Sequence, residues 1–210
     1  MIRRLIHKLP YFSFTSNTRP SIINKLNESL ITKIKEERKE FKVIANTGLL
    51  KTSGFKFVDS PGVLIMKVEK EFKECSVEIR YQANMNGEEE ENKGIGFALI
   101  IKFKTGSGLL VDCFAIEEEF IVYKTKYYKD INKLTEIKDM KDAVEMSQEY
   151  VGPDFRTLDP KVQSSFTDYI RSFGIDKNLL KFISRSIKDK ERLLYIIWLE
   201  KINEFANQHK

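Results

Sequence analysis

The spacing of apolar residues between about positions 54 and 128 constrains the fold more than any other feature of this sequence. Apolar side chains recur there at every second position, most clearly over residues 77–81 and 95–103. This period is typical of β-strands with one buried face. Turn-forming sequences at residues 86–87 and 105–108 separate successive strands, and the links are too short for the crossovers that parallel pairing requires. The pattern therefore predicts an antiparallel meander.

A single sheet has two faces, and the strand around residues 95–101 has apolar residues for both. Alternate residues from Ile95 to Ile101 line one side, whereas Ala98 and Ile100 make the other side apolar as well. Three helices at the chain ends cannot easily cover both faces. Because a large exposed apolar patch is unfavourable, we expect self-association to cover the second face.

Helical periodicity flanks the strands on both sides. Residues 21–41 form a predicted helix, whose narrow apolar stripe consists of Ile23, Leu26, Leu30, Ile34 and Phe41. A stripe this narrow favours helix-on-helix packing of the coiled-coil type. The expected partner is the last helix of the chain, which would contribute Leu194, Ile197, Trp198 and Phe205. The alternative is that the first helix lies on the sheet.

Residues 159–206 contain the signals for two further helices. Asp159 is an acidic N-cap, and Pro160 follows at the first helical position, where no backbone donor is lost. Gly174 suits the left-handed position that ends the first of these helices, and Asp176 can cap the next. The residues expected in the core and in assembly are Phe166, Tyr169, Tyr195, Trp198, Leu199, Ile202 and Phe205.

The order and spacing of residues in this C-terminal stretch form a recognisable signature. Its members are Tyr150, Gly152, Pro153, Phe155, Leu158, Asp159, Phe166, Tyr169, Ile170, Gly174, Ile175, Leu179, Leu180, Phe182, Ile183, Lys190, Tyr195, Trp198, Leu199, Ile202 and Phe205. This signature resembles that of the mitochondrial glycoprotein family, also called the mitochondrial acidic matrix proteins. Upstream of it, the similarity to the family is one of element order.

The resemblance implies both a fold and a role. The implied fold is α+β, with a single twisted antiparallel sheet of about seven strands, one N-terminal helix and two C-terminal helices, assembled as a ring-shaped homotrimer. The implied role is that of a non-enzymatic protein of the mitochondrial matrix. Such a protein binds other proteins as a scaffold or chaperone-like factor that supports mitochondrial gene expression, ribosome assembly or oxidative phosphorylation.

Basic residues concentrate at the N-terminus. The chain has 36 basic and 31 acidic residues, and residues 1–20 contain Arg3, Arg4, Lys8 and Arg19 but no acidic residue. The rest of the chain is nearly neutral, with 32 basic and 31 acidic residues. An acid-free N-terminus with arginine and serine is typical of a mitochondrial transit peptide; the alternative is a basic disordered tail. The remaining residues, 21–210, are long enough for one domain.

Known patterns of catalytic and metal-binding residues are missing from the sequence. Cys75 and Cys113 are expected to be free, buried thiols, and His7 and His209 lie near the termini. Zinc and haem sites need several Cys or His residues close together. Asp112 could act as a general acid if burial raised its pKa, but a solvent-facing strand residue is the expected interpretation. We therefore predict no enzyme activity, cofactor or metal.

Acidic residues gather in the predicted connections between elements. Glu88, Glu89, Glu90 and Glu91 form a run between two strands, and residues 129–158 form a second acidic connection. Runs of this kind usually keep a protein soluble. The functional alternative is a surface for basic mitochondrial proteins, because complementary charge steers their encounter. Here the near-neutral charge of residues 21–210 departs from the acidic character of the family, which weakens that alternative.

An RNA-binding accessory module of mitochondrial RNA processing or translation is the alternative function class. Residues 124–129 interleave lysines with tyrosines, as a surface that stacks on bases would. Lysines that protect an edge strand from aggregation explain the same pattern. No apolar run is long enough to span a membrane. The sequence thus predicts a protein-binding role without a membrane span, with RNA binding as the alternative.

Overall fold

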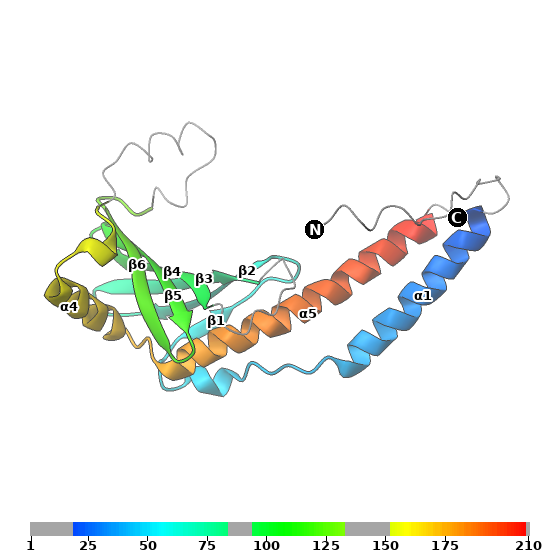
Figure 1. Ribbon diagram of the computed structural model, residues 1–210, viewed down its shortest axis with the longest axis horizontal. Helices are drawn as coiled ribbons and strands as arrows, with labels where there is room; N and C mark the ends of the chain where they lie inside the picture. Colours follow the sequence, from blue (N-terminus) through cyan, green and yellow to red (C-terminus); the bar gives the residue numbers. More distant parts are fainter. Residues whose placement is uncertain (1–18, 84–93, 133–151, 209–210) are drawn as a thin grey trace. The chain divides into compact units, whose positions relative to one another are not determined.

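The computed structural model describes residues 19–83, 94–132 and 152–208. The chain divides into two compact units. The larger unit comprises Lys42–Arg192 and contains all the described strands. The smaller unit pairs helix α1 (Arg19–Glu40) with the part of helix α5 (Lys177–Gln208) from Leu193 onward. Figure 1 shows the elements of each unit.

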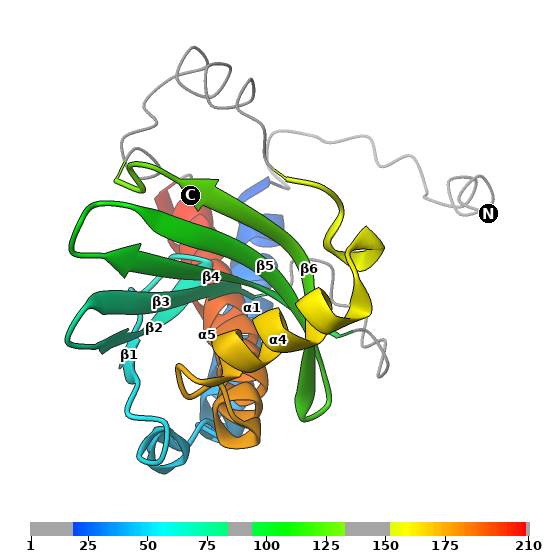
Figure 2. The ribbon, with the colours of Figure 1, turned by 90° about the vertical axis from the view of Figure 1, so that its left-hand side faces the viewer.

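The larger unit is built on one antiparallel sheet of six strands in sequence order (Figure 2). The strands are β1 (Lys56–Val58), β2 (Ile65–Glu71), β3 (Cys75–Gln82), β4 (Ile95–Phe103), β5 (Gly108–Ile116) and β6 (Glu119–Tyr128). The register between β5 and β6 shifts once, between Asp112 and Cys113. The predicted α+β fold, with a single antiparallel sheet and three helices, is confirmed. The described residues contain six strands where about seven were expected.

Helix α4 (Pro160–Arg171) and the first half of α5 pack on one side of the sheet, which we call the core face. The Phe57 ring lies edge-on to the Phe182 ring of α5, with centroids 5.1 Å apart. On the same face, the buried Ser186 hydroxyl donates to the Tyr81 hydroxyl at 3.0 Å. Two short 3₁₀ helices, η1 (Thr47–Leu50) and η2 (Phe155–Thr157), complete the unit. Strand residues that are fully buried in this core are Met66, Val68, Val77, Ile79, Leu99, Ile101 and Val111.

Local sequence signals set the ends of α4 and the start of α5. The Asp159 carboxylate accepts a hydrogen bond from the Lys161 backbone N–H at 2.8 Å. Gly174 has a φ of 92°, a left-handed conformation that strains residues with a Cβ atom. Asp176 then accepts from the Leu179 backbone N–H at 2.8 Å. The predicted capping roles of Asp159, Gly174 and Asp176 are therefore confirmed.

A buried ion pair connects α5 to the segment between β1 and β2. Lys190 is only 2% exposed, and its Nζ donates to the Asp59 carboxylate at 2.7 Å and to the Ser60 carbonyl at 2.8 Å. One residue earlier, the Asp189 carboxylate accepts hydrogen bonds from the backbone N–H groups of residues 44 and 45. Lys190 thus attaches the segment between β1 and β2 to α5, and Asp189 attaches the segment that precedes η1.

In the smaller unit, α1 and the C-terminal part of α5 lie antiparallel to each other (Figure 1). The Arg38 guanidinium pairs with the Glu200 carboxylate at 2.6 Å. Toward the other end of the pair, the Asn27 side-chain amide donates to the Asn207 side-chain oxygen at 2.9 Å. The predicted pairing of the first and last helices is therefore confirmed.

The residues that form this helix contact differ from the predicted ones. Leu26, which was expected in the contact, is 44% exposed, and its neighbour Asn27 is buried instead. The prediction that Trp198 and Phe205 face α1 is wrong, because these side chains are 54% and 61% exposed. Short side chains suit a closely packed helix pair, and the large aromatic rings lie outside the contact. The buried positions of α5 in this unit are Ile196, Leu199 and Ala206.

The second side of the sheet, which we call the outer face, is less apolar than predicted. Ala98 and Ile100 of β4 lie on it and are half-buried. Their neighbours across the strands include charged residues such as Arg80, Glu78 and Asp112. The expectation of a bare apolar second face is therefore wrong for most of the sheet. Strands β2 and β3 contribute mainly charged residues to this side, whereas Phe114 and Ile116 of β5 and Ile121 of β6 are exposed apolar residues on it.

We expect Lys190→Ala to lower the free energy of unfolding by about 2 kcal/mol, because the substitution removes the buried donor of the hydrogen bonds to the Asp59 carboxylate and the Ser60 carbonyl. Urea denaturation followed by circular dichroism measures the change. Lys188→Ala is the control, since Lys188 is exposed on the same helix and its removal should change stability by less than about 0.5 kcal/mol. Equal denaturation midpoints for the two variants would show that the ion pair does not stabilise the larger unit.

Candidate functional site

The described residues contain no group of three or more His, Cys, Asp or Glu side chains placed to hold a metal ion. Cys75 and Cys113 are free and buried, as predicted. Burial, helped by the neighbouring Asp112, raises the pKa of the Cys113 thiol to about 12, which disfavours the reactive thiolate. No helix of the described ranges is long and apolar enough to cross a membrane. The candidate functional features are therefore two surfaces, one in each unit.

The first surface is the outer face, where the strand register arranges side chains in rows. One row across the sheet consists of Lys67, Arg80, Ala98, Asp112 and Lys124. The next row consists of Lys56, Glu69, Glu78, Ile100, Leu110 and Lys126. A third row contains Ser76, Lys102 and Tyr128, with Gly108 between the last two. Acidic residues of these rows lie mainly on β2 and β3, and lysines predominate on β4 and β6.

On β2 and β3 the charges of the outer face are paired. The Lys67 ammonium contacts the Glu69 carboxylate at 3.0 Å and the Glu78 carboxylate at 3.2 Å, and Arg80 also pairs with Glu78. Partial burial by itself would raise the pKa of Glu78, but hydrogen bonds and charge from Arg80 and Lys67 outweigh it and lower this pKa below its ordinary value. This half of the face is consequently a self-neutralised network.

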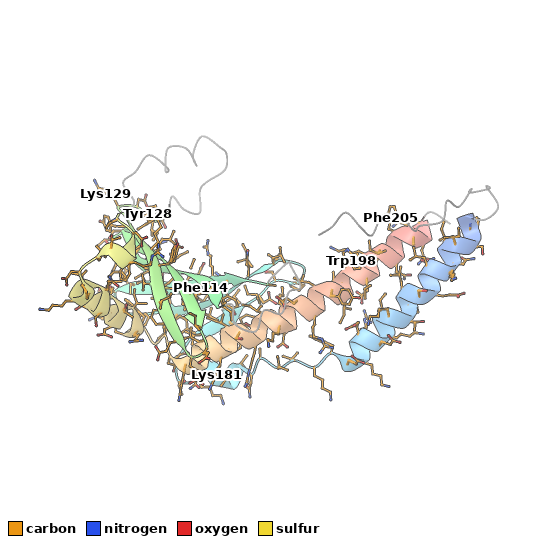
Figure 3. The ribbon with its side chains drawn as sticks, viewed as in Figure 1. Phe114, Tyr128, Lys129, Lys181, Trp198 and Phe205 are labelled. Atoms are coloured by element: carbon orange, nitrogen blue, oxygen red, sulfur yellow. The ribbon has the colours of Figure 1, made fainter. Side chains whose placement is uncertain are left out.

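On β4 and β6 the lysines of the outer face are unpaired. Lys102, Lys124 and Lys126 form no ion pair within the part of the chain that the structure describes. Lys102 is exposed, and the other two are half-buried. Lys129 is exposed next to Tyr128 at the end of β6 (Figure 3). We call Lys102, Lys124 and Lys126 the lysine cluster.

A hollow of about 240 Å³ opens on the outer face beside the lysine cluster. Its lining residues are Ser76, Glu78, Arg80, Ile100, Lys102, Ile131 and Asn132. The segment after β6 brings Ile131 over Gly108, where an added Cβ atom would lie 2.6 Å from the Ile131 Cδ1. The Ile131 backbone N–H donates to the Gly106 carbonyl at 2.9 Å, which fixes this segment. The hollow thus combines isoleucine side chains with charged groups.

The second surface is an exposed aromatic stripe on α5 in the smaller unit. It consists of the exposed Tyr195, Trp198 and Phe205, with the half-buried Ile202 between the last two, at spacings of three, four and three. The Tyr195 and Trp198 rings stack with centroids 6.2 Å apart and planes inclined by 15°. Figure 3 shows Trp198 and Phe205 on this part of the helix. Each exposed aromatic residue of the stripe comes one position before a residue that is buried in the contact with α1, namely Ile196, Leu199 or Ala206.

The predicted core and assembly residues divide between the two units. Leu199 is buried in the helix pair, where it faces α1 beside the aromatic stripe. Phe166 belongs to the larger unit, where it is half-buried and its ring lies 5.4 Å from the Phe155 ring. Tyr169 follows it on α4 and is 40% exposed. The structure therefore does not gather all seven residues in one cluster.

Several predicted features fall outside the described residues. These are the acidic run Glu88–Glu91, most of the N-terminal segment 1–20 and most of the acidic connection 129–158. The structure describes all of the lysine–tyrosine series at residues 124–129, and its members differ in exposure. Tyr127 is 66% exposed, whereas Tyr128 is buried at 8%.

Sequence reasoning missed the lysine cluster. It considered only the lysines of residues 124–129 and did not connect them with Lys102 of β4. The signal was available, because the two-residue period and the meander order together place Lys102 and Lys126 on the same side of the sheet. It also missed Asn27, which follows the helical spacing of Ile23 and Leu30 but was passed over as polar.

Comparisons with known proteins agree with this architecture. The sequence profile described as Mitochondrial glycoprotein matches residues 30–206. The Mitochondrial acidic protein mam33 of Schizosaccharomyces pombe is 34% identical over 103 residues. That alignment covers 49% of this chain and 38% of the yeast protein. The matched part is therefore less than half the length of that relative.

Two solved structures show the same fold. A Leishmania major protein, described as a sequence homologue of human p32, has a TM-score of 0.75 at 20% identity. The match covers 88% of this chain and 99% of the Leishmania chain. The Trypanosoma brucei p22 protein has a TM-score of 0.70 at 21% identity, over 89% of this chain and 99% of that one.

We expect Glu78→Gln to change the acid sensitivity of the protein. Because the folded-state pKa of Glu78 lies below its ordinary value of 4.5, its ionised form stabilises the fold above that pH. This contribution disappears as the pH falls through the lowered folded-state pKa. Urea denaturation at neutral pH and in acid should show a stability gap between the unchanged protein and Glu78→Gln that narrows in acid. Glu74→Gln, at an exposed position, is the control, and a gap of constant size would contradict the role given to the network.

Proposed function

The chain belongs to the mitochondrial glycoprotein family, and we propose that it is a non-enzymatic, protein-binding scaffold or chaperone-like factor of the mitochondrial matrix. Its proposed duty is to support mitochondrial gene expression, ribosome assembly or oxidative phosphorylation. Family membership and the description of the yeast relative support a mitochondrial protein. The observation that best supports a binding role is the aromatic stripe, of which Tyr195, Trp198 and Phe205 are exposed.

The aromatic stripe supports assembly of the protein with copies of itself. Its three-four-three spacing is the spacing of residues that face a second helix in a coiled coil. Exposed aromatic residues in such a row are characteristic of interfaces. The proposed assembly is a ring-shaped homotrimer, in which each subunit offers one such stripe and the ring closes by rotational symmetry.

The proposal also includes the partners that the charge pattern favours. Basic mitochondrial proteins are the proposed partners of the acidic run Glu88–Glu91, because opposite charge accelerates encounter and adds specificity. Residues 1–20 are proposed to act as the transit peptide. These two parts of the proposal rest on the sequence and on the family, since both segments lie largely or wholly outside the described residues.

An RNA-binding role has weaker support. A stacking platform needs neighbouring aromatic rings that bases can reach. Tyr128 is buried, and the exposed Tyr123 is covered by the Arg156 guanidinium at 4.9 Å from its ring centroid. The tyrosines of β6 therefore do not form one continuous accessible row.

We expect Trp198→Ala to reduce the oligomeric mass while leaving the folded chain largely intact. Trp198 is more than half exposed within the chain, so its removal affects mainly a contact made with another molecule. Light scattering coupled to gel filtration measures the mass, and circular dichroism measures the melting temperature. Leu199→Ala is the matched control, because Leu199 is buried against α1 and its truncation should cost about 2–5 kcal/mol of stability.

The two variants separate assembly from folding. A Trp198→Ala protein with the mass of the unchanged trimer would contradict the proposed interface. An unchanged protein that elutes as a single subunit would contradict the homotrimer itself.

A further inference from the structure

We propose that the lysine cluster of the outer face binds an acidic segment of a partner protein, and that the adjoining hollow receives an apolar side chain of that segment. The inference rests on the proposed protein-binding function and adds the chemistry of one class of partner. It concerns a different surface from both the aromatic stripe and the acidic run Glu88–Glu91.

The charges of the outer face favour an acidic partner. Lys102, Lys124 and Lys126 form no ion pair within the described ranges, and Asp112 is the one carboxylate that shares their part of the three rows. On β2 and β3, by contrast, Lys67 and Arg80 are already held by glutamates. Apart from Lys56 on the edge strand β1, the unpaired positive charge of this face therefore lies on β4 and β6, where it attracts and orients carboxylates.

The spacing of the lysine cluster suits an extended acidic segment. Lys124 and Lys126 are two residues apart on one strand, so their Cα atoms are separated by about 6.6 Å. Alternate residues of an extended partner segment repeat at the same distance, and two alternate glutamates can meet both lysines. Lys102 lies two strands away on the same face, at about 10 Å from β6. It can bind a third carboxylate on the far side of the segment.

The hollow supplies an apolar contact next to these charges. Ile100 and Ile131 line it, and Leu110 lies beside Ile100 in the same row. Glu78 and Arg80 also line the hollow, and they belong to the neutralised network with Lys67 and Glu69. The acidic residues of a partner meet the lysines of β4 and β6, and an apolar side chain two residues beyond them, on the same side of the extended segment, enters the hollow. This combination selects for a segment that is both acidic and apolar.

The same residues disfavour nucleic acid as the occupant. A single-stranded nucleic acid gains affinity from bases that stack on accessible aromatic rings. The apolar residues at the lysine cluster are aliphatic: Ile100, Leu110 and Ile131. The nearest aromatic residue of the rows, Tyr128, is buried. The exposed ring of the outer face next to these rows is Phe114 of β5, and one ring does not form a continuous stacking platform.

Fluorescence anisotropy with three labelled probes tests the inference on the full-length protein. The probes are a peptide with two glutamates and one leucine at successive alternate positions and serine between them, the same peptide with lysine in place of glutamate, and oligouridylate RNA. The test variant is Lys102→Glu/Lys124→Glu/Lys126→Glu. The control variant, Lys51→Glu/Lys161→Glu/Lys188→Glu, makes the same change in net charge at exposed positions of the larger unit that lie outside the sheet. Light scattering on the same samples reports whether each variant still assembles.

We expect the glutamate–leucine peptide to bind the unchanged protein, and to bind the test variant about tenfold or more weakly. The control variant should retain most of this affinity, and the lysine–leucine peptide should bind the unchanged protein less well. Preferential binding of RNA would overturn the inference in favour of a nucleic-acid surface. An equal loss of peptide affinity in the test and control variants would also overturn it, because net charge alone would then explain the binding. Unchanged peptide affinity in both variants would overturn the inference as well. Light scattering measures assembly independently of peptide binding. A failure of the inference about the lysine cluster can therefore be distinguished from a failure of the proposed homotrimer.

Discussion

The contact between the sheet and α5 is the interaction on which the larger unit depends. Alternate residues of five strands are buried on the core face, and α5 lies across them with Phe182 against Phe57 and Ser186 bonded to Tyr81. Burial of this apolar area is the main source of stability, and the Lys190–Asp59 pair fixes where the helix sits. Since one side of the sheet is committed to this core, the other side is left to display charge, and its division into paired and unpaired halves follows from the strand register.

The smaller unit shows how one helix can serve two contacts. From residue 195 onward, α5 has two parallel rows of apolar residues, offset by one position. The row of Ile196, Leu199 and Ala206 is buried against α1, with a hydrogen bond between Asn27 and Asn207 in the same contact. A polar pair in a helix contact costs stability but fixes the alignment of the helices. The second row, the aromatic stripe, is left outside that alignment, which is why it is available to another subunit.

Much of the fold could be predicted from the sequence because its signals are local. The two-residue period located the strands, and Asp159, Gly174 and Asp176 located the helix ends. The sequence did not reveal which of two adjacent helical rows faces α1, because Trp198 and Leu199 are both apolar and differ by only one position. It also suggested too apolar an outer face, because that inference used β4 without its neighbours. Which side chains meet across strands is a property of register, and register depends on the whole sheet.

The proposed homotrimer requires that the aromatic stripe be covered by other copies of the chain. Trp198 is the single tryptophan, so its fluorescence reports on this surface directly. Acrylamide quenching of that fluorescence should be measured over a series of protein concentrations. The account predicts that Trp198 is shielded from quenching when the protein is concentrated and becomes accessible on dilution, as the assembly dissociates. Equal, full quenching at every concentration would contradict it, because the stripe would then face water whether or not the protein assembles.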